Sequence, residues 1–368
     1  MNLIIDVQMI DVNSGGALTY IKNMLFHIFK NKENNITIYL IANKKNIDAL
    51  DIRTQNIFKI IKPKINTSSA LNRFIYSYFL IKFIDITFNK DDILWMPFNT
   101  GLNLRTKKVK SILTVHDFLV FDYPNCVPLF NRIFRKFSLT KSIKNANIII
   151  TVSNYTKQQL YVHCNHLINN KTVKVIYESA DTNVWNLDKK INNQNKEKFI
   201  LFVGVGRKNK NLEFLLESFK ILIIKYNYSG FLYIAGGVNA KYKKQLIELS
   251  INLSIEKKVK FLGFIADDDL KKFYQSTDTF VFPSYYEGFG LPILEANACG
   301  AKVCCSDATS LEEVGDNFTN YFNPFNQEEC ANVINFTLKD KYISHNKEIF
   351  SWEKSALEFL NLINDGRN

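Results

Sequence analysis

The sequence predicts an α/β protein made of two Rossmann-like domains, each built around a parallel β-sheet. Short apolar runs rich in β-branched and aromatic residues alternate with longer segments of helical period, which is typical of parallel sheets flanked by helices. The chain of 368 residues is too long for one hydrophobic core, and its 46% of hydrophobic residues can fill two. We therefore expect two domains of the same class.

Six apolar runs in the first half of the chain and five in the second are expected to form strands. The first six are LIIDVQM (3–9), NITIYLIAN (35–43), ILWMPF (93–98), KSILTVHDF (110–118), ANIIITVS (146–153) and VKVIYES (173–179). The other five are KFILFVGVG (198–206), SGFLYIAGG (229–237), KVKFLGF (258–264), TDTFVFPS (277–284) and AKVCCSD (301–307). Open α/β sheets bind ligands outside the carboxyl ends of their strands, so functional residues are expected in the loops that follow strands.

A polar segment without apolar periodicity separates the two sets of strands. It covers residues 186–198 (NLDKKINNQNKEK) and is the best candidate for a linker. Residues 1–185 are therefore assigned to an N-terminal domain and residues 199–351 to a C-terminal domain. Two such domains would have their parallel sheets facing across a cleft.

Positive charge is concentrated in the first half of the chain. Residues 1–180 carry 24 Lys and Arg against 11 Asp and Glu, a net charge of +13, whereas residues 181–368 carry 23 against 24, a net charge of −1. This asymmetry suggests that the first half faces an anionic partner, either nucleic acid or a phospholipid surface. The sequence contains no known nucleic-acid-binding motif, which argues against the first.

Cysteine usage and the N-terminal residues indicate the compartment. The six cysteines show no CxxC pair and no histidine at zinc-site spacing, so free thiols in a reducing compartment are expected. The first residues, MNLIIDVQMI, lack the basic start and cleavage site of a signal peptide, and no apolar run reaches about 18 residues without a charge. A cytoplasmic protein without a membrane-spanning helix is expected.

Two loops that follow strands combine glycine or cations with a helix N-terminus. After the first strand, Gly15 and Gly16 stand at the start of an amphipathic helix whose backbone N–H groups can bind a phosphate. In the alternative interpretation, the glycines only permit the turn from strand to helix. Later in the chain, Arg207, Lys208 and Lys210 stand just ahead of another helix. Cations there oppose the helix dipole, so an anionic ligand explains them, and a solvated charge run is the alternative.

Two further loops place titratable side chains at strand ends. His116 and Asp117 stand at the C-terminal end of the strand expected within 110–118, where a histidine is either structural or functional. In SYYEGFGLPILEANACG, residues 284–300, the glycines and proline make a continuous helix improbable. Glu287 is therefore expected on a loop, and Glu295 within a helix that starts near Pro292.

These segments together resemble the retaining GT-B glycosyltransferases of family 4. EGFGLPILE resembles the family's E-x7-E motif, FVGVGRKNKNLEFLLESF its phosphate-binding strand, loop and helix, NIIITVSNYTKQQL its interdomain serine segment, and FSWEKSALEFL its C-terminal crossover helix. The resemblance runs in order over most of the chain. It implies that a helix at about 352–368 packs back on the N-terminal domain.

The resemblance also implies a role for individual residues. Lys210 would neutralise the nucleotide diphosphate, Glu295 would bind the ribose hydroxyls, and Glu287 would lie beside the donor sugar. Further positions implied are His116 close to the transferred sugar, Gly16 at the phosphate, and Phe289, Gly290 and Leu291 as backbone contacts to sugar and phosphate.

The sequence departs from the family pattern at two places. Val205 and Asn209 occupy positions where the family commonly carries an arginine beside the phosphate-binding lysine, and Arg207 is expected to substitute. Glu178 and Ser179 stand where an Asn-Gly pair is frequent, which is expected to change the local turn rather than the chemistry.

The acidic run at Asp267–Asp269 invites comparison with the metal-binding D-x-D motif of the other major glycosyltransferase fold. It precedes an amphipathic segment, so Asp267 or Asp268 is better explained as a helix N-cap with favourable dipole charge. No metal and no other cofactor are predicted.

Two basic segments in the first half are aromatic and apolar. Residues 71–88 (LNRFIYSYFLIKFIDITF) carry scattered cations, and residues 130–145 (FNRIFRKFSLTKSIKN) alternate Phe and Ile with Arg and Lys. Both could lie on an anionic membrane surface with the apolar face down. In the other interpretation, the apolar faces cover the N-terminal sheet and the cations are solvated.

The sequence and the resemblance together predict a cytoplasmic, membrane-peripheral, retaining hexosyltransferase. It would move a hexose from a nucleotide sugar, with GDP-mannose favoured, to a lipid-linked oligosaccharide acceptor in bacterial surface polysaccharide or O-antigen synthesis. Two alternatives stay open: a nucleotide-sugar 2-epimerase of the same fold, and an inactive scaffold that binds glycan or membrane.

Overall fold

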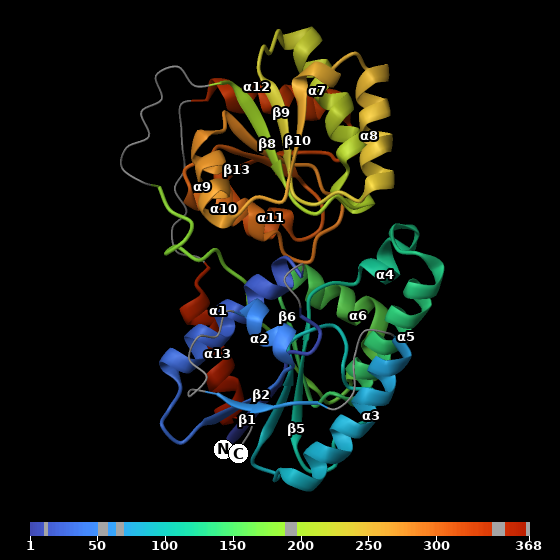
Figure 1. Cartoon of the computed structure of the whole chain (residues 1–368), viewed down its shortest axis with the longest axis vertical. Helices are drawn as coiled ribbons and strands as arrows, with labels where there is room; N and C mark the ends of the chain where they lie inside the picture. The colour runs from blue at the N-terminus through green and yellow to red at the C-terminus, as the bar shows by residue number, and fades with distance from the viewer. Residues whose placement is uncertain (11–13, 51–57, 64–69, 188–196, 341–349, 366–368) are drawn as a thin grey trace. The chain divides into compact units, whose positions relative to one another are not determined.

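The computed structural model of the chain describes residues 1–10, 14–50, 58–63, 70–187, 197–340 and 350–365. The chain divides into two compact units (Figure 1). Unit 1 contains Met1–Glu178 and Phe350–Asn368, and unit 2 contains Ser179–Ile349. Most of the linker expected at 186–198 lies outside the described residues. The C-terminal helix α13, Trp352–Asp365, belongs to unit 1.

Unit 1 is an α/β unit in which strands and helices alternate along the chain. Its strands are β1 Asn2–Asp6, β2 Thr37–Ile41, β3 Lys59–Ile61, β4 Ile93–Met96, β5 Lys110–Val115, β6 Ile148–Thr151 and β7 Thr172–Val175. Its helices are α1 Gly16–Asn31, α2 Lys44–Leu50, α3 Ala70–Thr87, α4 Leu119–Asp122, α5 Leu129–Asn145, α6 Asn154–Ile168 and α13.

Unit 2 repeats this alternation. Its strands are β8 Phe199–Val203, β9 Phe231–Ala235, β10 Val259–Gly263, β11 Thr279–Phe282, β12 Val303–Ser306 and β13 Thr319–Phe322. Its helices are α7 Leu212–Tyr226, α8 Ala240–Asn252, α9 Asp267–Ser276, α10 Leu291–Ala298, α11 Leu311–Gly315 and α12 Gln327–Lys339.

The two sheets share one strand order. Within the described residues, the first sheet has seven parallel strands in the order β3-β2-β1-β4-β5-β6-β7, and the second has six in the order β10-β9-β8-β11-β12-β13. In each sheet the order reverses direction at one place, between β1 and β4 and between β8 and β11. Open α/β sheets bind ligands at the carboxyl ends of the strands beside such a reversal. The prediction of two parallel-sheet units is confirmed.

Two strands were not predicted from the sequence. They are β3, which pairs with β2, and β13, which pairs with β12. Both lie at a sheet edge. The eleven predicted runs all contain strands of the structure.

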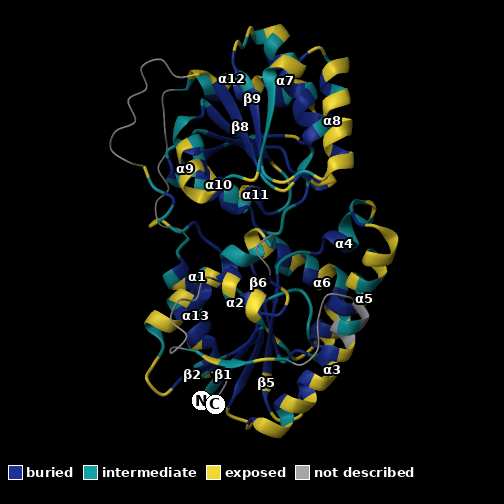
Figure 2. Ribbon diagram, in the orientation of Figure 1, coloured by how far each residue is buried: buried dark blue, intermediate teal, exposed yellow. Residues whose placement is uncertain are grey.

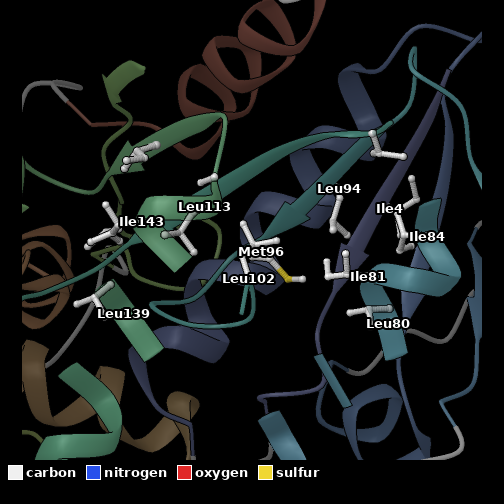
Figure 3. Packing of buried hydrophobic residues seen from close by; sticks show 14 of the residues in the cluster. Ile4, Leu80, Ile81, Ile84, Leu94, Met96, Leu102, Leu113, Leu139 and Ile143 are labelled. Atoms are coloured by element: carbon white, nitrogen blue, oxygen red, sulfur yellow. The ribbon is translucent and has the colours of Figure 1, made fainter. Parts of the chain in front are cut away.

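Apolar side chains fill the space between the strands and the helices of unit 1. Figure 3 shows Ile4, Leu94 and Leu113 from β1, β4 and β5 close to side chains of α3 and α5. The strands at the centre of each unit are buried, whereas α8 carries an exposed outer face (Figure 2). The buried strands explain why the sheets read as near-continuous apolar runs rather than as alternating ones.

The two basic, apolar segments form helices that are only partly used for packing. One face of α3 is buried through Leu80, Ile81 and Ile84, yet Phe79 and Ile86 are exposed. Among the described residues, no helix combines the length and apolar content needed to cross a bilayer.

Candidate active site

The loops that follow β8 and β11 meet at the strand-order reversal of unit 2. Lys210 lies in the first loop and Glu287 in the second, and Nζ of Lys210 is 2.5 Å from Oε1 of Glu287. Each side chain is 14% exposed. Nζ also lies 4.8 Å from the ring centroid of Phe282, a geometry that favours a cation. The structure therefore brings together the two residues that were expected to bind diphosphate and sugar.

Asn209 joins the same two loops through its backbone and its side chain. Its carbonyl accepts from the backbone N–H of Tyr285 at 3.0 Å, and its Nδ2 donates to the carbonyl of Tyr286 at 3.0 Å. Its side chain is buried, and its Oδ1 is buried without a hydrogen-bond partner among the residues that the structure describes. Asn209 thus occupies a structural position beside Lys210, whereas the side chain of Arg207 is exposed.

Hydroxyl groups at the end of β12 and in the loop after it hold the loop that carries Glu287. Oγ1 of Thr309 accepts from the backbone N–H of Glu287 at 3.0 Å. Oγ of Ser310 donates to the carbonyls of Glu287 at 3.1 Å and of Phe289 at 2.7 Å, and Oγ of Ser306 donates to the carbonyl of Ser284. These bonds fix the backbone on both sides of the carboxylate, so Glu287 can change partner without the loop moving.

Gly290 ends this loop and is the N-cap residue of helix α10. Its φ is +121°, and a Cβ there would lie 2.7 Å from the Leu311 side chain, so only glycine fits without strain. The helix starts at Leu291 with Pro292 in its first turn, which confirms the predicted start. The side chains of Phe289 and Leu291 are buried, so these two residues face the site through their backbone.

Glu295 points from α10 toward α9. Oε2 of Glu295 accepts from the hydroxyl of Tyr274 at 3.2 Å. Burial raises the pKa of Glu295 from 4.5 to about 7, the bond from Tyr274 opposes the rise, and the charge of Asp267 adds to it. Glu295 is of intermediate exposure, and its carboxyl group can pair with a hydroxyl of a ligand as it does with that of Tyr274.

The acidic run occupies the first turn of α9. The helix begins at Asp267, and its N-cap position is filled by Ala266, which makes no side-chain cap bond. The prediction that Asp267 or Asp268 is the N-cap is therefore wrong. The three aspartates still lie where the helix dipole favours negative charge.

In unit 1, two glycines stand where the loop after β1 passes into helix α1. Gly15 has a φ of 52°, outside the conformations that most residues adopt, and Gly16 is the first residue of the helix. Both glycines are exposed, which leaves the first helical turn open to an anion.

His116 follows β5 directly, as predicted. It therefore lies at the carboxyl edge of the sheet, as does the loop after β1. Its Nδ1 is 3.1 Å from Oε1 of Glu178, and its Nε2 is 2.8 Å from the carbonyl oxygen of Pro97. The side chain of His116 is 17% exposed and that of Glu178 is 7% exposed. Glu178 was expected to change the local turn, and the structure shows in addition that its carboxylate contacts a candidate site residue.

A buried carboxyl group that the sequence analysis did not single out is that of Asp6, at the end of β1. It accepts from the backbone N–H of Gln8 at 3.0 Å and from the hydroxyl of Tyr76 at 3.3 Å. Burial raises the pKa of Asp6 to about 7, against the lowering effect of both bonds. An aspartate at the end of an otherwise apolar strand was the available signal, because such a residue must be buried with the strand.

Comparison with known proteins agrees with this geometry. Residues 183–350 match the family model described as glycosyl transferases group 1. The O-antigen chain mannosyltransferase B of Escherichia coli is 28% identical over 268 residues, which cover 68% of this chain and 69% of that protein. The O-antigen chain mannosyltransferase RfbU of Salmonella typhimurium is 28% identical over 261 residues, with 71% and 69% covered.

Solved structures show the same fold over the whole chain. The sucrose-phosphate synthase of Thermosynechococcus elongatus aligns with a TM-score of 0.73 at 15% identity, covering 99% of this chain and 98% of that one. HepE of Anabaena, solved in complex with UDP, aligns with a TM-score of 0.67 at 17% identity, covering 99% and 97%.

Proposed function

Since this chain is a hexosyltransferase of the GT-B fold with a group 1 glycosyltransferase domain, we propose that it transfers a hexose from a nucleotide diphosphate sugar with retention of configuration. GDP-mannose is the favoured donor, because the most informative relatives bear the name mannosyltransferase. The acceptor is a lipid-linked glycan of a bacterial surface polysaccharide. The contact between Lys210 and Glu287 at the strand-order reversal is the observation that carries the proposal.

Lys210 has the chemistry of a leaving-group stabiliser. When the bond between the anomeric carbon and the phosphate oxygen breaks, negative charge grows on the diphosphate, and a nearby ammonium stabilises it. Lys210 is held over the Phe282 ring and is only 14% exposed, so its charge is poorly screened by water. One such donor typically contributes about 3–4 kcal/mol to the transition state.

Glu287 becomes available when Lys210 turns to the diphosphate. Its backbone stays fixed by Thr309 and Ser310, so the carboxylate is positioned to orient the sugar and to stabilise positive charge at the anomeric carbon. The acceptor oxygen bonds to the anomeric carbon on the face that the phosphate leaves, and the departing phosphate oxygen takes the acceptor's proton. No protein nucleophile and no metal ion take part in this scheme.

Transfer with the purified protein and GDP-mannose tests the proposal. The freshly formed linkage should keep the donor's anomeric configuration in NMR coupling constants, and the rate should be unchanged in EDTA. An inverted product would remove Glu287 from the proposed role, and loss of activity in EDTA would return the acidic run at Asp267–Asp269 to consideration. Turnover of the donor without any acceptor would indicate the 2-epimerase instead.

We further propose that the protein works at the cytoplasmic face of an anionic membrane. The first two turns of α5 present exposed apolar side chains, with Phe130 at 76% and Ile133 at 61% exposure, beside the cations Arg132 and Arg135. Exposed apolar groups flanked by Lys and Arg are typical of helices that lie on anionic bilayers.

Sedimentation with vesicles of anionic phospholipid tests this surface. Replacing Arg132, Arg135 and Lys136 with Glu should reduce binding, because each basic residue near the surface contributes about 1 kcal/mol. The matched control is the triple Glu variant of Lys241, Lys243 and Lys244, three exposed cations on α8 of unit 2. Equal binding by the α5 variant and the wild type would mean that the helix is not the contact.

A further inference from the structure

His116 is held in place by its backbone as well as by its ring. Its N–H donates to Oδ1 of Asn99 at 2.7 Å, and its carbonyl accepts from Oγ1 of Thr156 at 3.2 Å. The ring of Tyr20 meets the imidazole edge-on, with centroids 4.8 Å apart. The imidazole therefore has one orientation relative to the sheet of unit 1.

Both ring nitrogens of His116 face oxygen atoms that accept hydrogen bonds. Nε2 lies 2.8 Å from the carbonyl oxygen of Pro97, and because a carbonyl can only accept, Nε2 carries a proton. Nδ1 lies 3.1 Å from Oε1 of Glu178, and an ionised carboxylate also only accepts. Nδ1 then carries a second proton, and the pair is an imidazolium with a carboxylate.

The charged groups around the ring favour this state. Burial by itself would lower the pKa of His116, but the hydrogen bond and charge of Glu178, the carbonyl of Pro97 and the charge of Asp117 together raise it. Tyr20, the titratable side chain packed against the ring from α1, stays neutral because burial raises the pKa of its phenol.

We propose that Glu178 is a positioning residue for the transfer reaction, which holds His116 as a fixed cation that donates from both ring nitrogens. An imidazolium has no free lone pair and so cannot act as a general base for the acceptor. In the role that the family resemblance implies for His116, close to the transferred sugar, the ring would contribute positive charge, and the acceptor's proton would go to the departing phosphate. The role in transfer rests on the proposed function, because it is tested by activity. The protonation state of the His116 ring is measured by NMR and does not depend on activity.

The carboxylate of Glu178 is needed because a neutral side chain at position 178 would leave His116 neutral. An amide at position 178 would keep the hydrogen-bonding shape but not the negative charge. Burial would then outweigh the remaining favourable groups, since desolvation lowers the pKa of a buried histidine. The ring would lose the proton on Nδ1 and keep the one on Nε2, which faces Pro97.

The state of the ring can be read directly by NMR. Two-bond proton–nitrogen spectra of the full chain labelled with ¹⁵N-histidine resolve both nitrogens of each of its five histidines, and the His116→Asn variant assigns the signal. In the wild type, both nitrogens of His116 should stay protonated above the ordinary histidine range. In Glu178→Gln, the titration midpoint should fall by at least about one pH unit. Glu178→Asp keeps the carboxylate and should restore much of the shift.

The kinetics should follow the same titration. The kcat of Glu178→Gln should fall roughly tenfold per pH unit above the new midpoint, while the KM for the donor changes less. The matched control is Asp122→Asn. Asp122 pairs with Nε2 of His163 at 2.6 Å in the same unit, so its loss removes an equivalent contact and should leave the pH profile of transfer unchanged.

Two results would overturn the proposal. One is an unchanged titration of His116 in Glu178→Gln, and the other is a shifted titration with an unchanged pH profile of kcat. If the wild type releases no nucleoside diphosphate from any sugar nucleotide, the proposed function fails, and the NMR titration still decides whether Glu178 holds His116 as a cation.

Discussion

The ion pairs of the two units both lie in loops that follow strands, but they differ in their place in the sheet and in what their members are expected to bind. Lys210 and Glu287 follow the two strands at the order reversal, whereas His116 and Glu178 follow β5 and the edge strand β7. In unit 2, Lys210 and Glu287 are both expected to contact the donor, so the pair must separate when the donor arrives. In unit 1, Glu178 has no expected ligand besides His116, so that pair can persist through the reaction. The ion pair of unit 2 is therefore expected to separate during the reaction, whereas the ion pair of unit 1 is expected to stay intact.

This difference has an energetic consequence. A pair that must separate lowers the apparent affinity for the ligand, because part of the binding free energy is used to break it. A permanent pair has no such effect and instead fixes a charge state before the substrate binds. Variants of the two pairs should therefore differ in which kinetic constant they change.

The largest effect is expected for Lys210→Ala. Removing the ammonium should slow transfer by about 10²–10³-fold, because charge on the leaving diphosphate is no longer stabilised. The partly buried Glu287 also loses its partner. The measurement is kcat/KM for nucleoside diphosphate release, and Lys208→Ala, an exposed neighbour, is the control. A loss of less than about tenfold would mean that Lys210 is not the main contact of the diphosphate.

Glu287→Gln should separate binding from catalysis. Transfer should slow by about 10²-fold, since the neutral amide supports less positive charge at the anomeric carbon. Binding of free GDP, measured by calorimetry, should instead tighten by a few fold, because Lys210 no longer has to leave a carboxylate. Weaker GDP binding would show that the pair does not compete with the diphosphate.

Glu295→Ala should act mainly on donor affinity. The ribose hydroxyls lose an acceptor in the ground state and the transition state alike, so the Kd for GDP should rise by roughly tenfold while kcat changes little. Tyr274→Phe removes the hydrogen bond to Glu295 but keeps the carboxylate, which makes it the matched control. A kcat effect equal to that of Glu287→Gln would contradict the division between sugar and ribose.

The smallest effect concerns stability and pH. Because burial raises the pKa of Glu295 from 4.5 to about 7, the folded state binds the proton more tightly than the unfolded state. The contribution of Glu295 to stability is present below about pH 4.5 and lost as pH rises to about 7. Glu295→Gln should therefore stabilise unit 2 by about 1–2 kcal/mol at alkaline pH, seen as a higher Tm.

Asp6→Asn is the corresponding variant in unit 1. The pKa of Asp6 is likewise raised to about 7 by burial. The substitution should therefore raise the melting temperature of unit 1 and leave that of unit 2 unchanged. A pH-independent effect of either substitution would mean that the carboxyl group is not ionised at alkaline pH in the folded state.

The strands were predictable wherever both faces of the sheet are covered. Strands such as β4 and β8 are buried on both sides and have unbroken apolar sequences, ILWM and FILFV, which local sequence alone identifies. The edge strands β3 and β13 were missed because they are short and partly polar, with sequences KII and TNYF. They form because the strand that precedes each of them in the chain offers hydrogen bonds, which their own residues do not reveal.

The candidate site divides in the same way. Glycines, the proline and the charged residues of the loops after strands are local features, so Lys210, Glu287, Glu295 and His116 were all identifiable from the chain and its family resemblance. Their partners were not. Glu178 lies 62 positions from His116, and Asn209 and Lys210 lie about as far from the loop that they contact.

Those partners depend on the order of the strands. His116 follows β5 and Glu178 follows β7, with β6 between them in the sheet, so parallel pairing places both side chains at one edge. Local sequence determines which segments become strands and which loops carry charge, since both follow from periodicity and residue type. Which charges meet, and whether burial shifts their pKa values, depends on the packed sheet, because only packing brings distant loops together and removes water from them.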